Sequence, residues 1–362
     1  MNINNKNWET IWLEKNNKSI GVIDQTKLPY SFETLKLQSC SDAVEAIKKM
    51  VVRGAPLIGV TGAYAFALGV LEDSSDSAIN NHLKTIQLAR PTAINLKWST
   101  DRVYKKIYNL PYKERYEVAL QEAENIKAED IKMCSLIGDY GLEIIEEISK
   151  RKNNKTVNIL THCNAGWLAT IDWGTALSPI YKAKRAGIDL HVWVDETRPR
   201  NQGASLTAFE LASECVPYTV IVDNTGGYLM QNGEVDLVIV GSDRTTRTGD
   251  VCNKIGTYLK ALSAKDNQIP FYAALPFSTI DWEISDGSSD IPIEIRSEKE
   301  VSEISGIDSD GKINAIRLVP ENTKCFNPGF DVTPSRLVTG LITEKGISEA
   351  NEISLREMYE KN

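Results

Sequence analysis

Side chains that bind metals or form disulfides are scarce in this chain. The 362 residues include three histidines, and the six cysteines lie far apart without a CxxC pair. The common zinc-binding motifs need such pairs, and a disulfide framework needs regularly spaced cysteines. We therefore expect neither a metal site nor a cofactor, which leaves a cofactor-free enzyme or a binding protein.

Positive charge is also in deficit. The chain has 41 Lys and Arg residues against 49 Asp and Glu residues, a formal net charge of −8. Nucleic-acid-binding proteins normally carry a basic face, so we expect no nucleic-acid partner, although a local group of cations could still bind an anionic small substrate. The first residues lack the apolar core of a signal peptide, and no apolar run approaches membrane-spanning length. We expect a cytoplasmic protein without membrane contact.

The second half of the chain alternates between strand and helix patterns. Short apolar runs are separated by helical patterns such as residues 203–213 and 253–265. This alternation predicts an α/β fold with a doubly wound parallel sheet and helices on both faces. The predicted strands are residues 157–162, 189–195, 218–223, 236–241 and 270–274.

The first part of the chain mixes short strand patterns with helical ones. Residues 8–38 contain short β segments separated by turn signals, and residues 41–50 predict a helix capped by Ser41 or Asp42. The stretch 57–70 is apolar on all sides, which is typical of a buried helix. This part of the chain therefore predicts a smaller domain of mixed β and helical structure.

A long helix separates the two patterns. Apolar residues at helical spacing predict it near residues 126–150, just before the first strand of the alternation. We place the domain boundary between residues 115 and 130. The predicted domains are residues 1–122, mixed β and helical, and residues 123–362, which carry the parallel sheet.

Two predicted strands end in side chains suited to catalysis. The run 157–166 presents the thiol of Cys163, and the run 235–244 presents the carboxylate of Asp243. Ligands of open parallel sheets bind beyond the carboxyl ends of the strands, so both groups would face one crevice. Each residue also has a structural interpretation, since such a cysteine is usually a buried apolar group and such an aspartate usually caps a turn. We interpret His162 as structural, because neighbouring strand residues point to opposite faces.

Three cationic side chains and one side-chain amide could together bind a phosphate. Asn253 and Lys254 open the predicted helix 253–265, where free backbone N–H groups favour an anion. Arg53 and Arg90 each precede a helix after a breaker, and their guanidinium groups could make bidentate contacts. Alternatively, Arg53 only forms an ion pair with a carboxylate, for which Glu196 is the candidate.

Other charged groups and motifs favour no known nucleotide site. Arg198 and Arg200 fit surface or interface charges. The chain has no GxGxxG after a strand and no GxxxxGK[ST], so neither a nicotinamide-binding domain nor a P-loop is indicated.

A series of distinct short motifs is spread along nearly the whole chain. They are Arg53-Gly-Ala-Pro56, residues 90–96, Thr161-His-Cys-Asn-Ala-Gly166, residues 196–203, Gly241-Ser-Asp-Arg244, Gly249-Asp250, residues 253–258, Pro276-Phe-Ser-Thr279, Ile291-Pro-Ile-Glu294 and residues 327–334. Taken together, they resemble the methylthioribose-1-phosphate isomerase family, which is similar in turn to the regulatory subunits of translation initiation factor 2B.

The resemblance implies an isomerase that converts a 5-substituted ribose 1-phosphate into the ribulose 1-phosphate, with a small phosphorylated sugar as substrate. It also implies a smaller N-terminal domain, a Rossmann-like C-terminal domain, a homodimer and a place in methionine salvage. In this family the motif cysteine and aspartate are the catalytic pair, which here are Cys163 and Asp243. The family's contacts to the substrate phosphate correspond to Arg53, Gly54, Ala55, Arg90, Gln202, Asn253 and Lys254.

Departures from the family pattern concern the choice of substrate. Trp167 and Leu275 replace smaller residues, and their bulk favours 5-deoxyribose 1-phosphate slightly over the 5-methylthio sugar, unless both lie outside the pocket. A ribose 1,5-bisphosphate isomerase would need extra cations near C5, for which Arg247 is the candidate. A non-catalytic regulatory subunit of the initiation-factor type would need neither a cysteine nor an aspartate at matching strand ends.

Overall fold

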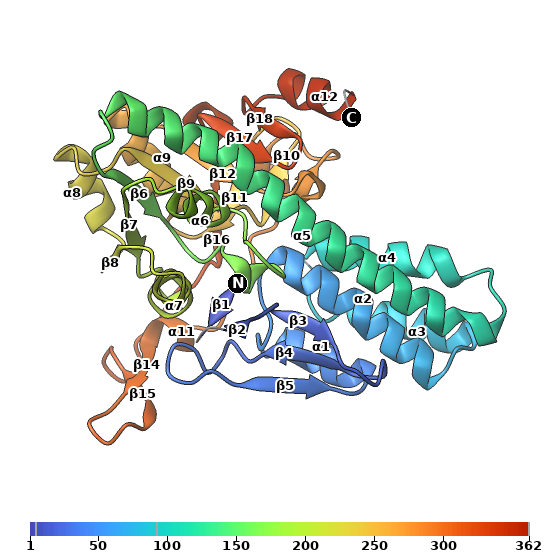
Figure 1. Ribbon diagram of the computed structural model, residues 1–362. Coiled ribbons are helices and arrows are strands. Elements are labelled where there is room, and N and C mark those ends of the chain that lie inside the picture. Colours follow the sequence, from blue (N-terminus) through green and yellow to red (C-terminus); the bar gives the residue numbers. More distant parts are fainter. Residues whose placement is uncertain (4–5, 92, 361–362) are drawn as a thin grey trace.

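A seven-stranded sheet forms the centre of the larger part of the molecule (Figure 1). The computed structural model describes residues 1–3, 6–91 and 93–360. Every pairing in this sheet is parallel except that of β18 with β17. In spatial order the strands are β18 (Gly346–Ser348), β17 (Gly340–Thr343), β12 (Phe271–Ala274), β9 (Leu237–Val240), β6 (Val157–Thr161), β7 (Leu190–Asp195) and β8 (Tyr218–Ile221). The five predicted strands are confirmed, with ends that differ by no more than two residues.

Helices cover both faces of this sheet. Successive residues of a strand point to opposite faces, so each strand contributes side chains to two separate apolar cores. Ile159 and Ile239 belong to one apolar core, and their neighbours Leu160 and Val238 belong to another. The first core contains residues of α5 and α6, and the second contains residues of α8 and α9. The helices are α5 (Tyr112–Arg151), α6 (Ser178–Arg185), α7 (Ala208–Ser213), α8 (Thr225–Gln231) and α9 (Thr257–Asp266). The chain therefore has an α/β fold around a large, mainly parallel sheet.

The N-terminal part combines a small antiparallel sheet with a group of helices (Figure 1). Its elements are β1 (Asn2–Ile3), β2 (Lys6–Asn7), β3 (Ile11–Leu13), β4 (Ile20–Ile23), β5 (Thr34–Leu37), α1 (Cys40–Lys48), α2 (Ala55–Glu72), α3 (Asp76–Gln87) and α4 (Ile94–Ile107). The predicted N-caps of α1, Ser41 and Asp42, are both wrong: Ser39 is the N-cap, the helix begins one residue earlier than predicted, and Asp42 completes the capping box.

Helix α2 is long and apolar enough, by length and composition, to cross a membrane. The expectation that no apolar run approaches membrane-spanning length is therefore wrong for residues 55–72. In the fold, 78% of the 18-residue stretch Ala55–Glu72 is buried, and α2 packs against α1, α3, α4 and α5. The observed environment of α2 is thus the protein core, as predicted for residues 57–70.

Helix α5 begins well before its predicted start and runs for 40 residues without a break. Its first half contributes Ala119 and Ala123 to the N-terminal core, and its second half contributes Ile137 and Ile145 to the core under the large sheet. The proposed boundary at residues 122 and 123 falls inside this helix, so the domain division stays a prediction.

A second sheet lies beside the large one and contains a strand where we predicted the start of a helix. Its order is β13 (Ile280–Asp281), β10 (Arg244–Thr246), β11 (Val251–Lys254) and β16 (Phe330–Thr333). Asn253 and Lys254 end β11, and α9 begins only at Thr257, so the predicted helix start at Asn253 is wrong. The reason is the distant partner strand β16, whose Asp331 and Phe330 pair with these two residues.

The remaining elements are short. They are η1 (Trp167–Ala169), the π-helical turn η2 (Gly203–Thr207), η3 (Phe277–Thr279), α10 (Gly287–Asp290), α11 (Lys299–Ser302), β14 (Glu303–Ile307), β15 (Ile313–Arg317), η4 (Ser335–Leu337) and α12 (Glu352–Glu360). The hairpin of β14 and β15 projects from the body of the molecule (Figure 1).

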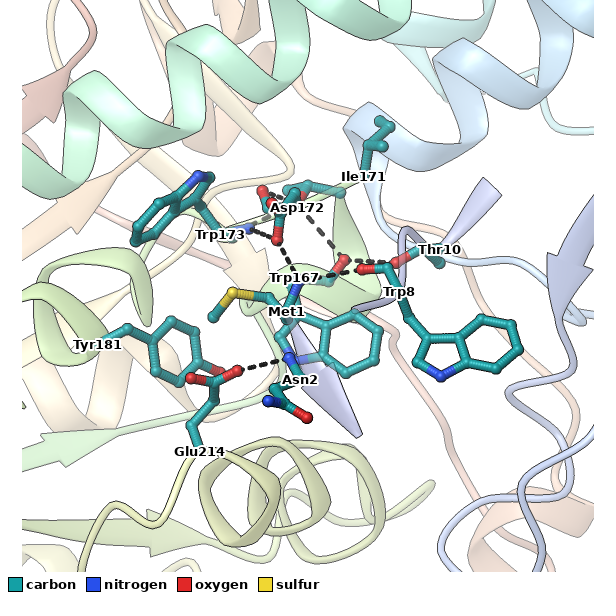
Figure 2. Close-up of polar contacts among 12 residues, drawn as sticks. Met1, Asn2, Trp8, Thr10, Trp167, Ile171, Asp172, Trp173, Tyr181 and Glu214 are labelled. Atoms are coloured by element: carbon teal, nitrogen blue, oxygen red, sulfur yellow. Dashed lines mark hydrogen bonds and ion pairs between the residues drawn. The ribbon is translucent and has the colours of Figure 1, made fainter. Parts of the chain in front are cut away.

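The N-terminal segment packs on the loop that follows β6 (Figure 2). The Met1 amino group lies 2.9 Å from Asp172 Oδ1, and Thr10 Oγ1 donates a hydrogen bond to the Trp167 carbonyl at 2.8 Å. The Thr10 N–H donates to the Ile171 carbonyl at 3.0 Å. The loop that begins at Cys163 is therefore fixed from this side by the first residues of the chain.

Candidate active site

One cavity brings together all nine residues that the sequence suggested. It lies beyond the carboxyl ends of β6 and β9 and beside the start of α2. Its walls include Cys163, Asp243, Arg53, Gly54, Ala55, Arg90, Gln202, Asn253 and Lys254. The position agrees with the rule for open parallel sheets.

Cys163 follows β6 by two residues and has a left-handed backbone, with φ of 69°. Its side chain is 8% exposed. Burial raises the pKa of the thiol, while the positive charges of Arg53 and Lys254 act in the opposite direction. The thiol thus lies in a dry environment whose cations can stabilise its thiolate.

Asp243 lies three residues beyond β9, and its N–H donates a hydrogen bond to the Cys252 carbonyl at 2.9 Å. Burial raises the pKa of its carboxyl, although Lys254, Arg90 and Arg53 lower it in part. The net shift is upward, so a proton is held more tightly here than on an exposed aspartate, and the protonated form is the one that can donate.

Arg90 Nη2 lies 3.8 Å from Glu294 Oε2, whereas Arg53 and Lys254 are held by carbonyl and amide oxygens. Arg53 donates from Nη1 to Asn164 Oδ1 at 2.6 Å and from Nη2 to the Asn164 carbonyl at 2.9 Å. Lys254 Nζ donates to the Gly329 carbonyl at 2.8 Å and lies 4.7 Å from the centroid of the Phe330 ring. Burial lowers the pKa of Lys254, as expected for a cation with little access to water. An anion would replace some of that lost hydration.

The start of α2 supplies backbone donors next to these cations. Gly54 is the N-cap of this helix, with φ of 92°, and a Cβ there would lie 2.3 Å from the Ala169 carbonyl oxygen. Glycine is therefore required at this position. Gln202 faces the cavity from the loop after β7, and its buried Oε1 has no hydrogen-bond partner in the described part of the chain. Both features leave polar groups for a ligand.

Comparison with known proteins identifies the family of this chain. The profile of the initiation factor 2 subunit family matches residues 51–350. The chain belongs to this family. Methylthioribose-1-phosphate isomerases of Methylorubrum populi and Escherichia coli O45:K1 are 56% and 55% identical over 99% of this chain, covering 98% and 96% of their own lengths.

Solved structures of this family are similar over the whole chain. The 5-methylthioribose 1-phosphate isomerase of Pyrococcus horikoshii OT3 is 36% identical, with a TM-score of 0.85 over 99% of this chain and 97% of that one. A translation initiation factor eIF-2B subunit delta from A. fulgidus is 37% identical, with a TM-score of 0.79 over 98% and 100%. Because these two identities are nearly equal, the fold alone does not separate an isomerase from an initiation factor subunit.

Several residues of the cavity escaped the sequence analysis. Arg200, which we interpreted as a surface charge, lines the cavity and donates to Glu300 at 2.9 Å. Arg296 also lines it and is paired with Glu294 at 2.8 Å and with Glu300 at 2.6 Å. The only signal for Arg296 was its place two residues after the Ile291–Glu294 motif. Asn164, which orients Arg53, was part of a recognised motif without an assigned role.

The residues expected to determine the substrate lie elsewhere. Trp167 and Leu275 are both fully buried in the apolar cores, and neither is among the residues that line the cavity. Their bulk therefore gives no reason to favour the 5-deoxy sugar, and the alternative interpretation holds. Arg247 lies 3.4 Å from Glu352 of α12 and is not a cavity residue either.

A cluster of His162, Asp195 and Asp223 places three potential metal ligands within 4.8 Å of one another. The carboxylates are already engaged, since Lys260 Nζ lies 3.1 Å from Asp195 Oδ2 and Asp223 accepts backbone N–H groups. Both ring nitrogens of His162 are bonded at 2.8 Å, to Asp195 Oδ2 and to the Ile255 carbonyl. His162 also lines the cavity, and because its ring is fully hydrogen-bonded we interpret the cluster as structural support for the cavity wall.

Proposed function

We propose that this protein is a methylthioribose-1-phosphate isomerase, which converts the aldose S-methyl-5-thioribose 1-phosphate into the corresponding ribulose 1-phosphate. The observation that carries the proposal is the presence of a thiol, a carboxyl group of raised pKa and several cations in one cavity. Relatives of that name, 51–56% identical over 99% of the chain, support it.

The chemistry requires an acid and a second group that handles hydrogen. An aldose 1-phosphate is locked as a cyclic acetal, so a proton must reach the ring oxygen before the ring can open. We assign that step to Asp243, because burial raises the pKa of its carboxyl. Hydrogen must then move from C2 to C1, as a proton through an enol or as a hydride. We assign Cys163 to that end of the sugar, as base or proton shuttle.

The phosphate would be fixed by the cations and by the start of α2. Arg53, Arg90 and Lys254 provide charge-assisted donors, and Gly54 and Ala55 provide backbone N–H groups. Such anchoring holds the sugar so that its reacting carbons stay between the acid and the thiol.

The 5-substituent has a suitable recess next to Asp243. This recess shares Asp243 and Arg90 with the main cavity, and Ile58, Ala93 and Ile291 give it an apolar wall. Arg244 also lines it, and its Nη1 lies 3.8 Å from Asp281 Oδ2. An apolar methylthio group gains from burial there, whereas a second phosphate would need unpaired cations. The recess thus favours the methylthio sugar over ribose 1,5-bisphosphate.

The remaining features follow from membership of the family. We infer a catalytic Rossmann-like domain of residues 123–362, a smaller N-terminal domain of residues 1–122, a homodimer and a place in the cytoplasm. The division of the apolar cores along α5 supports the two domains.

Turnover on three substrates tests the function. The purified protein is assayed with the 5-methylthio, 5-deoxy and 5-phospho derivatives of ribose 1-phosphate. We expect the highest kcat/KM for the methylthio sugar, about 10–200-fold above the 5-deoxy sugar if the sulfur and methyl fill the recess. Preference for the bisphosphate would contradict the assignment of the recess. Binding without turnover of any of the three would indicate a regulatory protein.

A further inference from the structure

The backbone around Cys163 is held in a conformation that most residues avoid. Cys163 has φ of 69°, and Thr197, in the loop after β7, has φ of 66°. Left-handed backbone is rare for non-glycine residues and is especially unfavourable for a β-branched threonine. Such conformations persist where surrounding contacts impose them, and they cluster at functional sites.

Two buried threonine hydroxyls bracket the peptide groups of Cys163. Thr197 Oγ1 accepts a hydrogen bond from the Cys163 N–H at 2.8 Å and donates to the Asp195 carbonyl at 3.0 Å. Thr207 Oγ1 donates to the Cys163 carbonyl at 2.7 Å and accepts from Asn164 Nδ2 at 3.2 Å. A hydroxyl has one hydrogen to donate, and the carbonyl partners fix its direction in both cases.

Both threonines are themselves rigidly placed. The Asp223 carboxylate accepts the N–H groups of Thr197 and Arg198 at 2.7 and 2.8 Å. Thr207 ends the π-helical turn η2, a distortion that is frequent at functional sites. Gly203 begins this turn, and a Cβ there would lie 1.7 Å from the Asp195 carbonyl oxygen, so the turn packs directly on the end of β7.

We propose that Thr197 and Thr207 are positioning residues that hold the Cys163 backbone in its left-handed conformation and so aim the thiol into the sugar-phosphate cavity. The proposal rests on the proposed role of Cys163 in isomerisation. It gives a purpose to the loop after β7, whose Thr197 and Gly203 belong to one motif and whose Gln202 lines the cavity.

The charged groups that face the thiol explain why its direction matters. Arg53 and Lys254 stabilise the thiolate, and Asp243 opposes them. A relaxed backbone would turn the sulfur away from the two cations and from the reacting carbons. Asn164 would stay in place, because its Nδ2 also donates to Glu210 Oε1 at 2.8 Å. The contacts to the phosphate should therefore survive.

Isosteric substitutions remove the hydroxyl hydrogen bonds alone. We would prepare Thr197→Val and Thr207→Val, with Thr197→Ser and Thr207→Ser to restore the hydroxyl. Thr333→Val is the matched control, because Thr333 is fully buried and its Oγ1 has no hydrogen-bond partner among the described residues. Thermal unfolding of each variant shows whether the fold is intact.

The expected signature is a loss of kcat with little change in KM. Each valine variant should lower kcat about tenfold or more, while KM changes less than about threefold, and serine should restore most of the rate. Thr333→Val should match the wild type. Wild-type kcat in both folded valine variants would overturn the proposal, and so would a rise in KM alone.

A second measurement is independent of turnover. The rate at which iodoacetamide alkylates Cys163 is followed by peptide mass spectrometry across a pH series. We expect the pH midpoint to move upward in both valine variants, whatever the change in access does to the maximal rate. If the wild type isomerises none of the sugars, the proposed function fails and this midpoint still tests the positioning. An unchanged midpoint in both folded variants would overturn it.

Discussion

Glu210 offers a sharp test of how the loop after β6 is held. This carboxylate of α7 is fully buried and accepts four hydrogen bonds. The donors are Asn164 Nδ2 at 2.8 Å, the Trp167 N–H at 2.8 Å, the Leu168 N–H at 3.1 Å and the Tyr181 hydroxyl at 2.7 Å. Through Asn164 it orients Arg53, so the variant Glu210→Gln should affect both folding and substrate binding.

The pH dependence of this effect has a definite sign and size. Burial raises the pKa of Glu210 from 4.5 to about 7, although its four donors favour the ionised form. The folded state therefore binds this proton more tightly than the unfolded state. The resulting stabilisation is complete below pH 4.5 and is lost as the pH rises through about 7. Its size is about 3 kcal/mol for a shift of this magnitude.

Urea unfolding of the wild type and of Glu210→Gln at about pH 5 and about pH 8 measures this pH-dependent contribution of Glu210 to the free energy of unfolding. Because glutamine does not titrate, the free energy of unfolding of the wild type minus that of the variant should fall by about 2–3 kcal/mol between the two pH values. A difference that is independent of pH would refute the reasoning.

Asp130→Asn is the matched control for substrate binding. Burial also raises the pKa of Asp130 to about 7, and its carboxylate accepts the Ile171 N–H rather than a group of the cavity. This variant should show a similar dependence of stability on pH with an unchanged KM. Glu210→Gln should raise KM, because the amide nitrogen of glutamine cannot accept the hydrogen bonds that one carboxylate oxygen accepts now.

The other predictions concern the cavity directly. Cys163→Ala and Asp243→Asn should each abolish turnover and leave the binding of the sugar phosphate, measured by calorimetry, largely intact; near-normal rates would refute their roles. Lys254→Met should raise KM about 10–100-fold, as for the loss of a charge-assisted hydrogen bond. Gly54→Ala should lower the melting temperature more than Gly187→Ala, because both positions have positive φ but only the first Cβ meets other atoms within 4 Å. In pH–rate profiles, kcat should fall at a higher pH on the alkaline side than kcat/KM does, because bound phosphate would offset the cations that lower the pKa of Asp243. Alkaline limbs at the same pH would contradict this effect.

Local patterns were sufficient to predict the frame of the site. Buried parallel strands are short apolar runs, so β6 and β9 were visible in the sequence, and their ends placed Cys163 and Asp243 at one edge. The buried helix α2 was equally clear from its apolar residues 57–70, although it already begins inside the Gly-Ala-Pro breaker, at Ala55. These features depend on residues that are neighbours in the chain.

Features that depend on distant partners could not be predicted in this way. Asn253 and Lys254 were taken into a helix because nothing near them indicates that β11 pairs with β16, about 75 residues later. Arg296 reaches the cavity from a loop that is anchored by its N–H bond to the Asn327 carbonyl at 2.8 Å. Its charge is balanced by Glu294 and Glu300, which resemble ordinary surface acids in the sequence.

The cavity combines two requirements that oppose each other. In the proposed mechanism the phosphate is bound by Arg53, Arg90 and Lys254, yet these cations lower the pKa of Asp243, which would have to be protonated to donate to the ring oxygen. Burial outweighs them in the free protein, since the net pKa is raised. A bound phosphate dianion would neutralise the same three cations and remove their effect on the acid. The substrate would then increase the protonation of its own catalyst, which is why kcat should persist to higher pH than kcat/KM.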